Sequence, residues 1–218
     1  MTAPFPTPEH TATVSVLMLM FNDVELLDFA GPYEVFTTAN RMAARMRLEA
    51  GDTTPAAPVF ELVTASVDGA PVRARAGLRL SPDHALATAP ATTWVLVPGG
   101  VVDQLLANPA LLAELARRGQ HAGCIASVCT GAFVLAAAGL LQHAPATTHW
   151  EDQADLAQRH PDLQVLDGPR WVEAGRCITS AGIAAGIDMA LHLVARHAGT
   201  ALAQRTARQM DTPWHQHP

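Results

Sequence analysis

Cysteine is scarce in this sequence, which has three cysteines in 218 residues. An odd and small number gives no framework of paired disulfides and suits a reducing compartment. We therefore expect free thiols and a cytoplasmic location. Long hydrophobic runs are missing as well, because the apolar run at residues 14–21 is too short to span a bilayer. The residues before it lack the basic segment of a secretion signal, so we expect neither export nor a membrane partner.

Positive charge is also in short supply. Lysine and arginine together number 14 against 20 aspartates and glutamates, which gives a formal net charge of -6. A chain without a basic stripe cannot neutralise a phosphate backbone, so we expect no nucleic-acid partner. The proline-rich opening, residues 1–12, is predicted to be a disordered arm. Residues 13–212 are then expected to form one domain, followed by a tail at 213–218.

Short apolar runs alternate with helical patterns along the chain. Strands are predicted at residues 14–21, 59–65, 94–97, 125–128 and 164–166, short β pieces at 68–80, and a hairpin at 170–179. Helices are predicted at residues 31–47, 101–118 with a break at 108–109, 132–141, 183–196 and 201–210. This alternation predicts an α/β fold with a mostly parallel sheet between helices, in which ligands bind at the carboxyl ends of the strands.

Cys129 stands where the strand at 125–128 meets the helix at 132–141. A sharp turn there would lift the side chain above the sheet, and the free N–H groups of the next helix would favour a thiolate. Serine hydrolases place their nucleophile on the same kind of turn. The alternative is an inert, buried cysteine, which is how we interpret Cys124 and Cys177.

Gly100 and Thr130 are the candidates for stabilising negative charge. Gly99-Gly100 follows the strand at 94–97, and Thr130 follows Cys129. Glycine lets backbone N–H groups approach a substrate, so the N–H groups of Gly100 and Thr130 could hold a developing negative charge. The alternative for the two glycines is a simple turn.

Asp28 and His149 are the candidates for proton transfer. Asp28 lies in an apolar segment, where burial would raise its pKa into a useful range, although it could instead be a helix cap. Glu25 is a competing carboxylate that we expect to be solvated. His149 is the preferred histidine partner of Cys129 among ten histidines. His215 and His217 lack a third ligand, so no metal site is expected.

Four ordered motifs resemble the ThiJ/PfpI superfamily: VPGG at 97–100, SVCTGAFVLAAAGLL at 127–141, ATTHW at 146–150 and TSAGIAAGID at 179–188. The resemblance covers roughly residues 14–210. It implies a flavodoxin-like, doubly wound fold of the class I glutamine amidotransferase type, a reactive cysteine at Cys129 and a homodimer.

Two branches of that superfamily look most similar, the isonitrile hydratases and the ligand-binding halves of AraC-type regulators. The first implies a cofactor-free hydro-lyase acting on a small electrophilic molecule, with Cys129 as nucleophile, Asp28 as proton carrier and Thr130 in support. The second implies a small-molecule or redox sensor without turnover, and the motifs at 178–182 and 205–210 look closer to it. Regulators continue into a DNA-binding module, which we do not expect here. A generic protective thiol is a third possibility.

Overall fold

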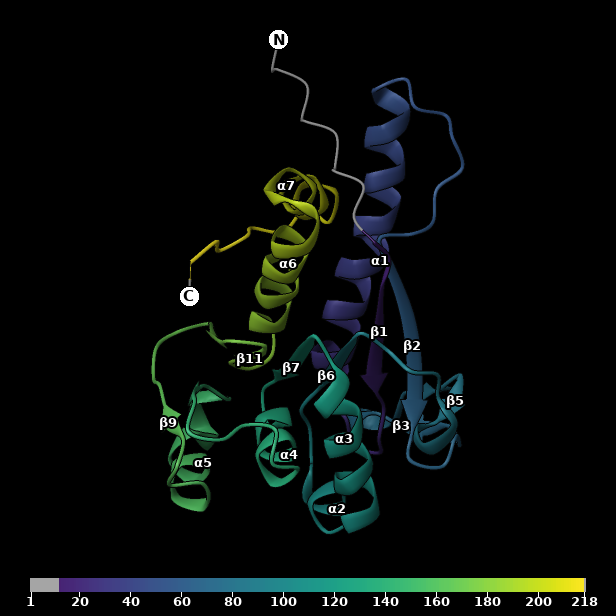
Figure 1. Cartoon of the computed structure of the whole chain (residues 1–218). Coiled ribbons are helices and arrows are strands. Elements are labelled where there is room, and N and C mark those ends of the chain that lie inside the picture. The colour runs from purple at the N-terminus through teal and green to yellow at the C-terminus, as the bar shows by residue number, and fades with distance from the viewer. Residues whose placement is uncertain (1–11, 218) are drawn as a thin grey trace.

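Buried apolar strands form the middle of the structure, a computed structural model that describes residues 12–217. Seven strands form one sheet in the order β10-β11-β7-β6-β1-β2-β5 (Figure 1). Their bounds are β1 Val14–Leu19, β2 Phe60–Ser66, β5 His84–Ala85, β6 Trp94–Val97, β7 Cys124–Val128, β10 Trp171–Ala174 and β11 Cys177–Ser180. All neighbours pair in parallel except β10, which runs antiparallel to β11. The predicted parallel sheet and its edge hairpin are confirmed.

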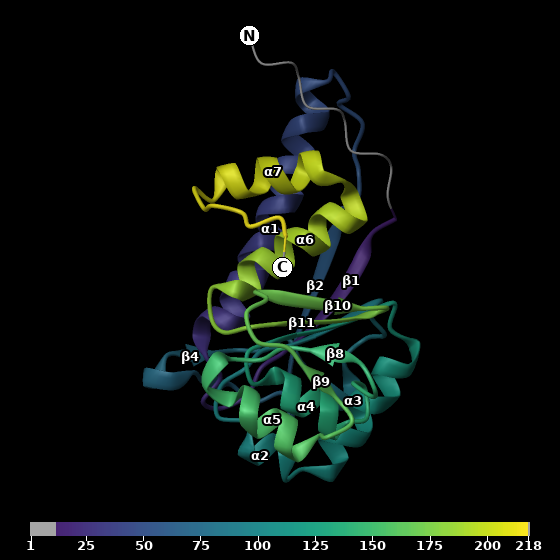
Figure 2. The same ribbon diagram turned by 90° about the vertical axis from the view of Figure 1, so that its left-hand side faces the viewer.

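Helices cover both faces of this sheet, so strands β6 and β7 are buried along their whole length. One layer holds α1 (Leu26–Glu49), α6 (Ala185–Ala198) and α7 (Thr200–Gln209). The opposite layer holds α2 (Asp103–Leu106), α3 (Pro109–His121) and α4 (Gly131–Ala137), with α5 (Gln153–Arg159) beside them (Figure 2). The break predicted at residues 108–109 separates α2 from α3, where the Asn108 side chain accepts a hydrogen bond from the Leu111 N–H.

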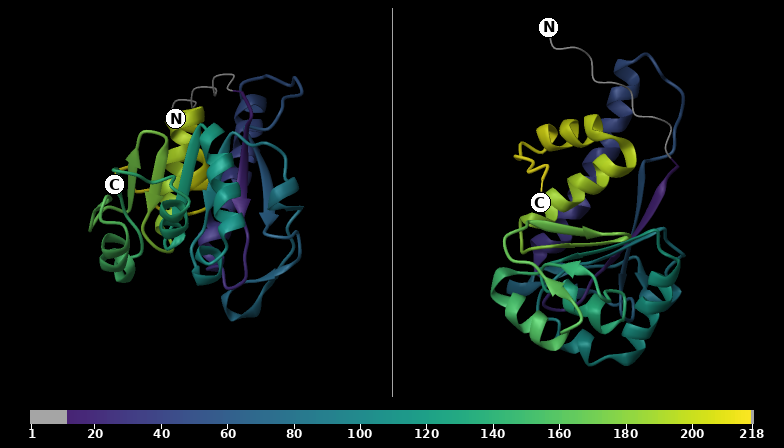
Figure 3. Two further views of the ribbon diagram at one scale, coloured as in Figure 1. Left: turned by 60° about the horizontal axis from the view of Figure 1, so that its bottom comes forward. Right: turned by 60° about the vertical axis from the view of Figure 1, so that its left-hand side comes forward.

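The strand order reverses direction between β1 and β6. From β1 the chain crosses through α1 to β2 on one side, whereas β6 and β7 follow on the other side (Figure 3). In doubly wound sheets, loops diverge at such a reversal and leave a crevice at the carboxyl ends of the strands. The segments after β1, β6 and β7 therefore meet at one edge, as the sequence predicted.

Helix α1 differs most from its predicted bounds. It begins at Leu26, five residues before the predicted start at Gly31, so Pro32 lies inside the helix. Proline has no N–H to donate to the preceding turn of a helix and is therefore common at the first helical position. For that reason the sequence around Pro32 predicts a helix start there. As a consequence, Asp28 lies in the first turn of α1 rather than in a loop.

Three smaller differences concern short elements. The strand predicted at 164–166 forms β9 (Gln164–Val165), which pairs with β8 (Pro145–Ala146) in a separate small sheet. The β pieces predicted at 68–80 are β3 (Val72–Arg73) and β4 (Arg79–Leu80). Helix α4 ends at Ala137, before Gly139 with its φ of +70°. The predicted arm lies outside the described residues except for Ala12.

The C-terminal segment is attached to α6. The buried Asp188 carboxylate accepts hydrogen bonds from the Arg170 Nε at 2.6 Å and from the His215 backbone N–H at 2.9 Å. Part of the predicted tail is thus bound to the domain.

Candidate functional site

Cys129 occupies a sharp turn between β7 and α4. Its φ of +54° lies in the left-handed region, which is unfavourable for a residue with a side chain. Two hydrogen bonds hold this backbone, because the Cys129 N–H donates to the Ser180 carbonyl at 3.1 Å and the Thr148 hydroxyl donates to the Cys129 carbonyl at 2.8 Å. The turn is the strand-to-helix elbow that the sequence predicted.

Two glycines let the neighbouring backbone approach this elbow. A Cβ atom at Gly131 would lie 2.2 Å from the Val97 carbonyl oxygen, which no real side chain tolerates. A Cβ atom at Gly99 would lie 2.7 Å from both the Thr130 nitrogen and Asp28 Oδ2. The glycines are therefore required for close approach of the ends of β6 and β7.

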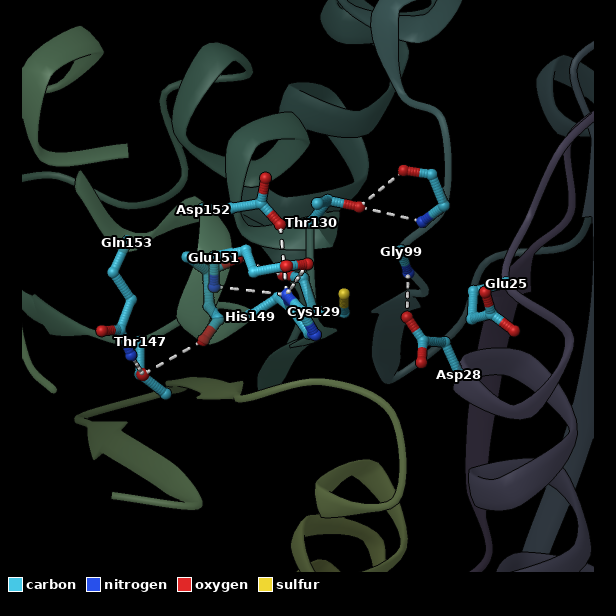
Figure 4. Close-up of polar contacts among 12 residues, drawn as sticks. Glu25, Asp28, Gly99, Cys129, Thr130, Thr147, His149, Glu151, Asp152 and Gln153 are labelled. Atoms are coloured by element: carbon cyan, nitrogen blue, oxygen red, sulfur yellow. Dashed lines mark hydrogen bonds and ion pairs between the residues drawn. The ribbon is translucent and has the colours of Figure 1, made fainter. Parts of the chain in front are cut away.

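Asp28 reaches the same point from the first turn of α1 and is fully buried. Its Oδ2 accepts a hydrogen bond from the Gly99 N–H at 3.1 Å, whereas Oδ1 has no hydrogen-bond partner among the described residues (Figure 4). Burial raises the pKa of Asp28 to about 7, although the Gly99 N–H and the Cys129 thiol lower it in part. Asp28 can therefore both accept and release a proton near neutral pH.

Cys129 itself is held as a thiol. Burial raises its pKa to about 12, and the neighbouring Asp28 charge adds to this effect while the Thr130 N–H opposes it. A rise of that size corresponds to roughly 4 kcal/mol, whereas a helix N-terminus contributes about 0.3–1 kcal/mol. The expected thiolate is therefore not the resting form, because the dipole of the short α4 cannot outweigh burial and a nearby carboxylate.

Thr130 and Gly100 form a contact with each other that differs from the one expected. The Gly100 N–H donates to Thr130 Oγ1 at 2.8 Å, and this hydroxyl donates back to the Gly100 carbonyl at the same distance. The Gly100 N–H is thus occupied and does not face a substrate together with the Thr130 N–H. Its backbone is turned away by a bridge with Val24 and a φ of +143°. The Thr130 N–H remains directed at the sulfur.

His149 lies on the other side of Cys129 from Asp28 (Figure 4). A Cβ atom at Gly182 would be 2.2 Å from His149 Cδ2 and 3.3 Å from Cys129 Sγ, so both side chains border the same small space. The ring nitrogen Nδ1 faces the carboxylates of Asp152 at 3.6 Å and Glu151 at 3.7 Å. The structure therefore brings His149 to the site, and among the described residues it forms no hydrogen bond with Cys129.

Sequence reasoning missed Thr148, Ser180 and Asp152. Thr148 and Ser180 hold the elbow through one hydroxyl and one carbonyl, and nothing in their residue type distinguishes these roles. Asp152 could have been found from its position three residues after His149, since such spacing places side chains on one face of a helical turn. Glu25 is half-buried and lies 3.6 Å from Arg75.

The described residues contain no group of three histidines, cysteines or acidic residues placed to hold a metal ion. Residues 12–217 also include no helix whose length and apolar character would let it cross a membrane. A separate cavity of about 240 Å³ lies at the ends of β1 and β2, bordered by Phe21, Val101 and other residues, and does not include Cys129.

Comparison with known proteins identifies the family. An isonitrile hydratase from Pseudomonas putida is 34% identical over 194 residues, which cover 88% of this chain and 76% of that enzyme. An HTH-type transcriptional regulator, GbdR, from Pseudomonas aeruginosa is 31% identical over 204 residues, 92% of this chain but 51% of the regulator. The crystal structure of a ThiJ/PfpI family protein from Pseudomonas syringae superposes with a TM-score of 0.80 at 27% identity, over 97% of this chain and 80% of that one. Residues 14–196 match the DJ-1/PfpI family, and the chain therefore belongs to the DJ-1/PfpI family.

Proposed function

We propose that this protein is a cysteine-dependent, cofactor-free hydro-lyase acting on a small electrophilic molecule, most concretely an isonitrile. The observation that carries the proposal is the pairing of the Cys129 thiol with the buried Asp28 carboxyl, whose pKa of about 7 lets it exchange protons at neutral pH. The similarity to an isonitrile hydratase over most of both chains supports it.

The isonitrile carbon must gain both a nucleophile and a proton, so a thiol beside a carboxylate suits this reaction. The sulfur of Cys129 bonds to the terminal carbon of R–N≡C, Asp28 takes the thiol proton, and the same proton passes to that carbon to give the thioimidate R–N=CH–S–Cys. No free thiolate need accumulate, because the proton leaves sulfur as the carbon–sulfur bond forms.

Water completes the reaction. Asp28 accepts a proton from water as its oxygen bonds to the thioimidate carbon, and the imine nitrogen gains a proton. The carbon–sulfur bond then breaks, the hydroxyl proton returns to sulfur through Asp28, and R–NH–CHO leaves. The sum is one isonitrile plus one water giving one N-substituted formamide. The Thr130 N–H, directed at the sulfur, stabilises negative charge that develops on it as the bond breaks.

A sensor is the second candidate. Its support is the similarity to GbdR over about half of that regulator. In this proposal Cys129 binds a ligand or is oxidised without turnover. A cytoplasmic homodimer remains part of either proposal.

The test is an isonitrile panel incubated with the wild type, Cys129→Ala and Asp28→Asn, with formamide formation followed by mass spectrometry. We expect turnover by the wild type and losses of at least about a hundredfold in both variants. Cys177→Ser serves as the control, because Cys177 donates to the Leu140 carbonyl away from the site. Absence of turnover by the wild type rejects the hydratase, and a stable sulfenic or sulfinic acid at Cys129 after peroxide then favours the sensor.

A further inference from the structure

Negative charge surrounds Cys129 on two sides. Asp28 and Glu25 lie on the side of α1, and Glu151 and Asp152 lie on the side of His149 (Figure 4). The charges of Asp28 and Asp152 both reach the sulfur strongly enough to raise the pKa of Cys129. Cys129 therefore lies between two pairs of carboxylates.

Two arginines near this edge, and the ring of His149, are each paired with a carboxylate. The chain contains no lysine, so its cationic side chains are arginines and histidines. Arg75 lies 3.6 Å from Glu25, and Arg170 donates to the buried Asp188 at 2.6 Å. His149, when protonated, is flanked by Glu151 and Asp152. The arginines are the groups that would hold a carboxylate or phosphate on a substrate, and these two are already engaged.

A second observation points to the ligand. Asp28 Oδ1 is buried and has no hydrogen-bond partner among the described residues, so this carboxyl, which borders Cys129 at Gly99, keeps one unused acceptor. An acceptor of this kind repels an anionic group and is satisfied by a donor or a positive charge.

We propose that the Cys129 site selects electrophiles that carry a positive charge and discriminates against anionic ones. The selection acts on any reagent that reacts with Cys129, and its extension to isonitriles rests on the proposed function. Charges a few ångströms apart in a partly solvated site interact weakly. We therefore expect a cationic reagent to react on the order of fivefold faster than a neutral one. This difference in rate should decrease as the salt concentration rises.

Two thiol reagents that differ in charge test this without any turnover. Trimethylammonioethyl and sulfonatoethyl methanethiosulfonate both transfer a thioalkyl group: the sulfur of Cys129 bonds to the reagent's sulfur, methanesulfinate leaves, and the thiol proton goes to Asp28 or solvent. Rates at Cys129 are measured by peptide mass spectrometry and divided by the rates with free β-mercaptoethanol. We expect a normalised cation-to-anion ratio of about ten or more at low salt. A ratio of one or below overturns the proposal.

Asp152→Asn removes one of the charges without touching the reacting pair. We expect the normalised ratio to fall about threefold. Uncharged methyl methanethiosulfonate should react at least as fast as with the wild type, because loss of this charge lowers the pKa of Cys129, and this reaction shows that the site is intact. Asp155→Asn is the matched control, because Asp155 is an acidic residue of α5 already paired with Arg159. An unchanged ratio in Asp152→Asn, or an equal fall in Asp155→Asn, contradicts the proposal.

An isosteric substrate pair connects the selection to catalysis. Neohexyl isocyanide and isocyanoethyl-trimethylammonium differ only in carbon against charged nitrogen, and we expect kcat/KM to be about fivefold higher for the cation. Turnover of both compounds with equal kcat/KM overturns the charge selection and still supports the proposed hydratase activity. Turnover of neither rejects the hydratase, while the thiol reagents still decide the charge selection.

Discussion

Asp28 and Cys129 influence each other's protonation. With pKa values of about 7 and about 12, the proton rests on sulfur at neutral pH, and the carboxyl is divided between its two forms. Each charge makes the other less favourable, so neither residue can be altered without changing its neighbour. Asp28 therefore has two opposite effects on Cys129, since it can take the thiol proton during reaction and also raises the pKa of the resting thiol.

Asp28→Asn separates these two effects. Removing the carboxylate lowers the pKa of Cys129, so we expect alkylation by iodoacetamide at pH 8 to become several-fold faster. Isonitrile turnover should be lost in the same variant, because no group remains to carry the proton. The measurement compares second-order alkylation rates at Cys129 with formamide production. Slower alkylation in Asp28→Asn would show that the carboxylate acts mainly as a base even with this reagent.

The loop between β11 and α6 leaves room for the His149 ring beside Cys129. Gly182 lies in this loop with a conformation open to any residue, so only the space around it forbids a side chain. That space is taken up by the imidazole and the sulfur. The loop therefore determines how closely the two side chains approach.

Gly182→Ala is expected to push the His149 ring away from Cys129. We expect isonitrile turnover to fall about tenfold or more, with a loss of roughly 1–2 kcal/mol in the free energy of unfolding from the added methyl group. Gly123→Ala is the matched control, because its Cβ would meet nothing closer than the Thr93 carbonyl at 3.7 Å. Turnover and urea-unfolding midpoints are measured for both variants. Equal turnover in the two would mean that the position of His149 has no role in the reaction.

Elements with an apolar pattern could be predicted from the sequence, and elements without one could not. β1, β6 and β7 are apolar runs, and the motif around Cys129 marks the elbow. By contrast, α5 has one buried residue, Leu156, and so shows no apolar periodicity. The start of α1 was missed because Pro32 has the features of a first helical residue. The contact between Thr130 and Gly100 depends on the backbone torsions of Gly100, which no residue pattern reveals.

At the scale of the whole molecule, Asp28 reduces stability as pH rises. Its pKa is raised from 3.8 to about 7 on folding, so the folded protein binds this proton more tightly than the unfolded chain. The contribution of Asp28 to the free energy of unfolding is fully present below about pH 4 and is lost as pH rises through 7. The total effect is on the order of 4 kcal/mol.

Asp28→Asn should therefore be more stable than the wild type at pH 8, and the difference should shrink toward pH 4. We expect an advantage of roughly 2–4 kcal/mol at the higher pH. Urea unfolding of both proteins across this range measures the difference, and subtraction removes groups common to both, such as His197, whose pKa is lowered by burial. A constant difference at all pH values would show that Asp28 titrates normally in the folded protein.

The elbow has a consequence for how the chain folds. Its backbone is held by Ser180 and Thr148, and its thiol is covered by α1 and the end of β6, segments that are far apart in the sequence. No partial structure made of neighbouring segments can bury Cys129, because the burial needs both halves of the chain. Protection of this thiol from a thiol reagent should therefore appear late in refolding. The reactivity of Cys129 would then report on the last step of folding.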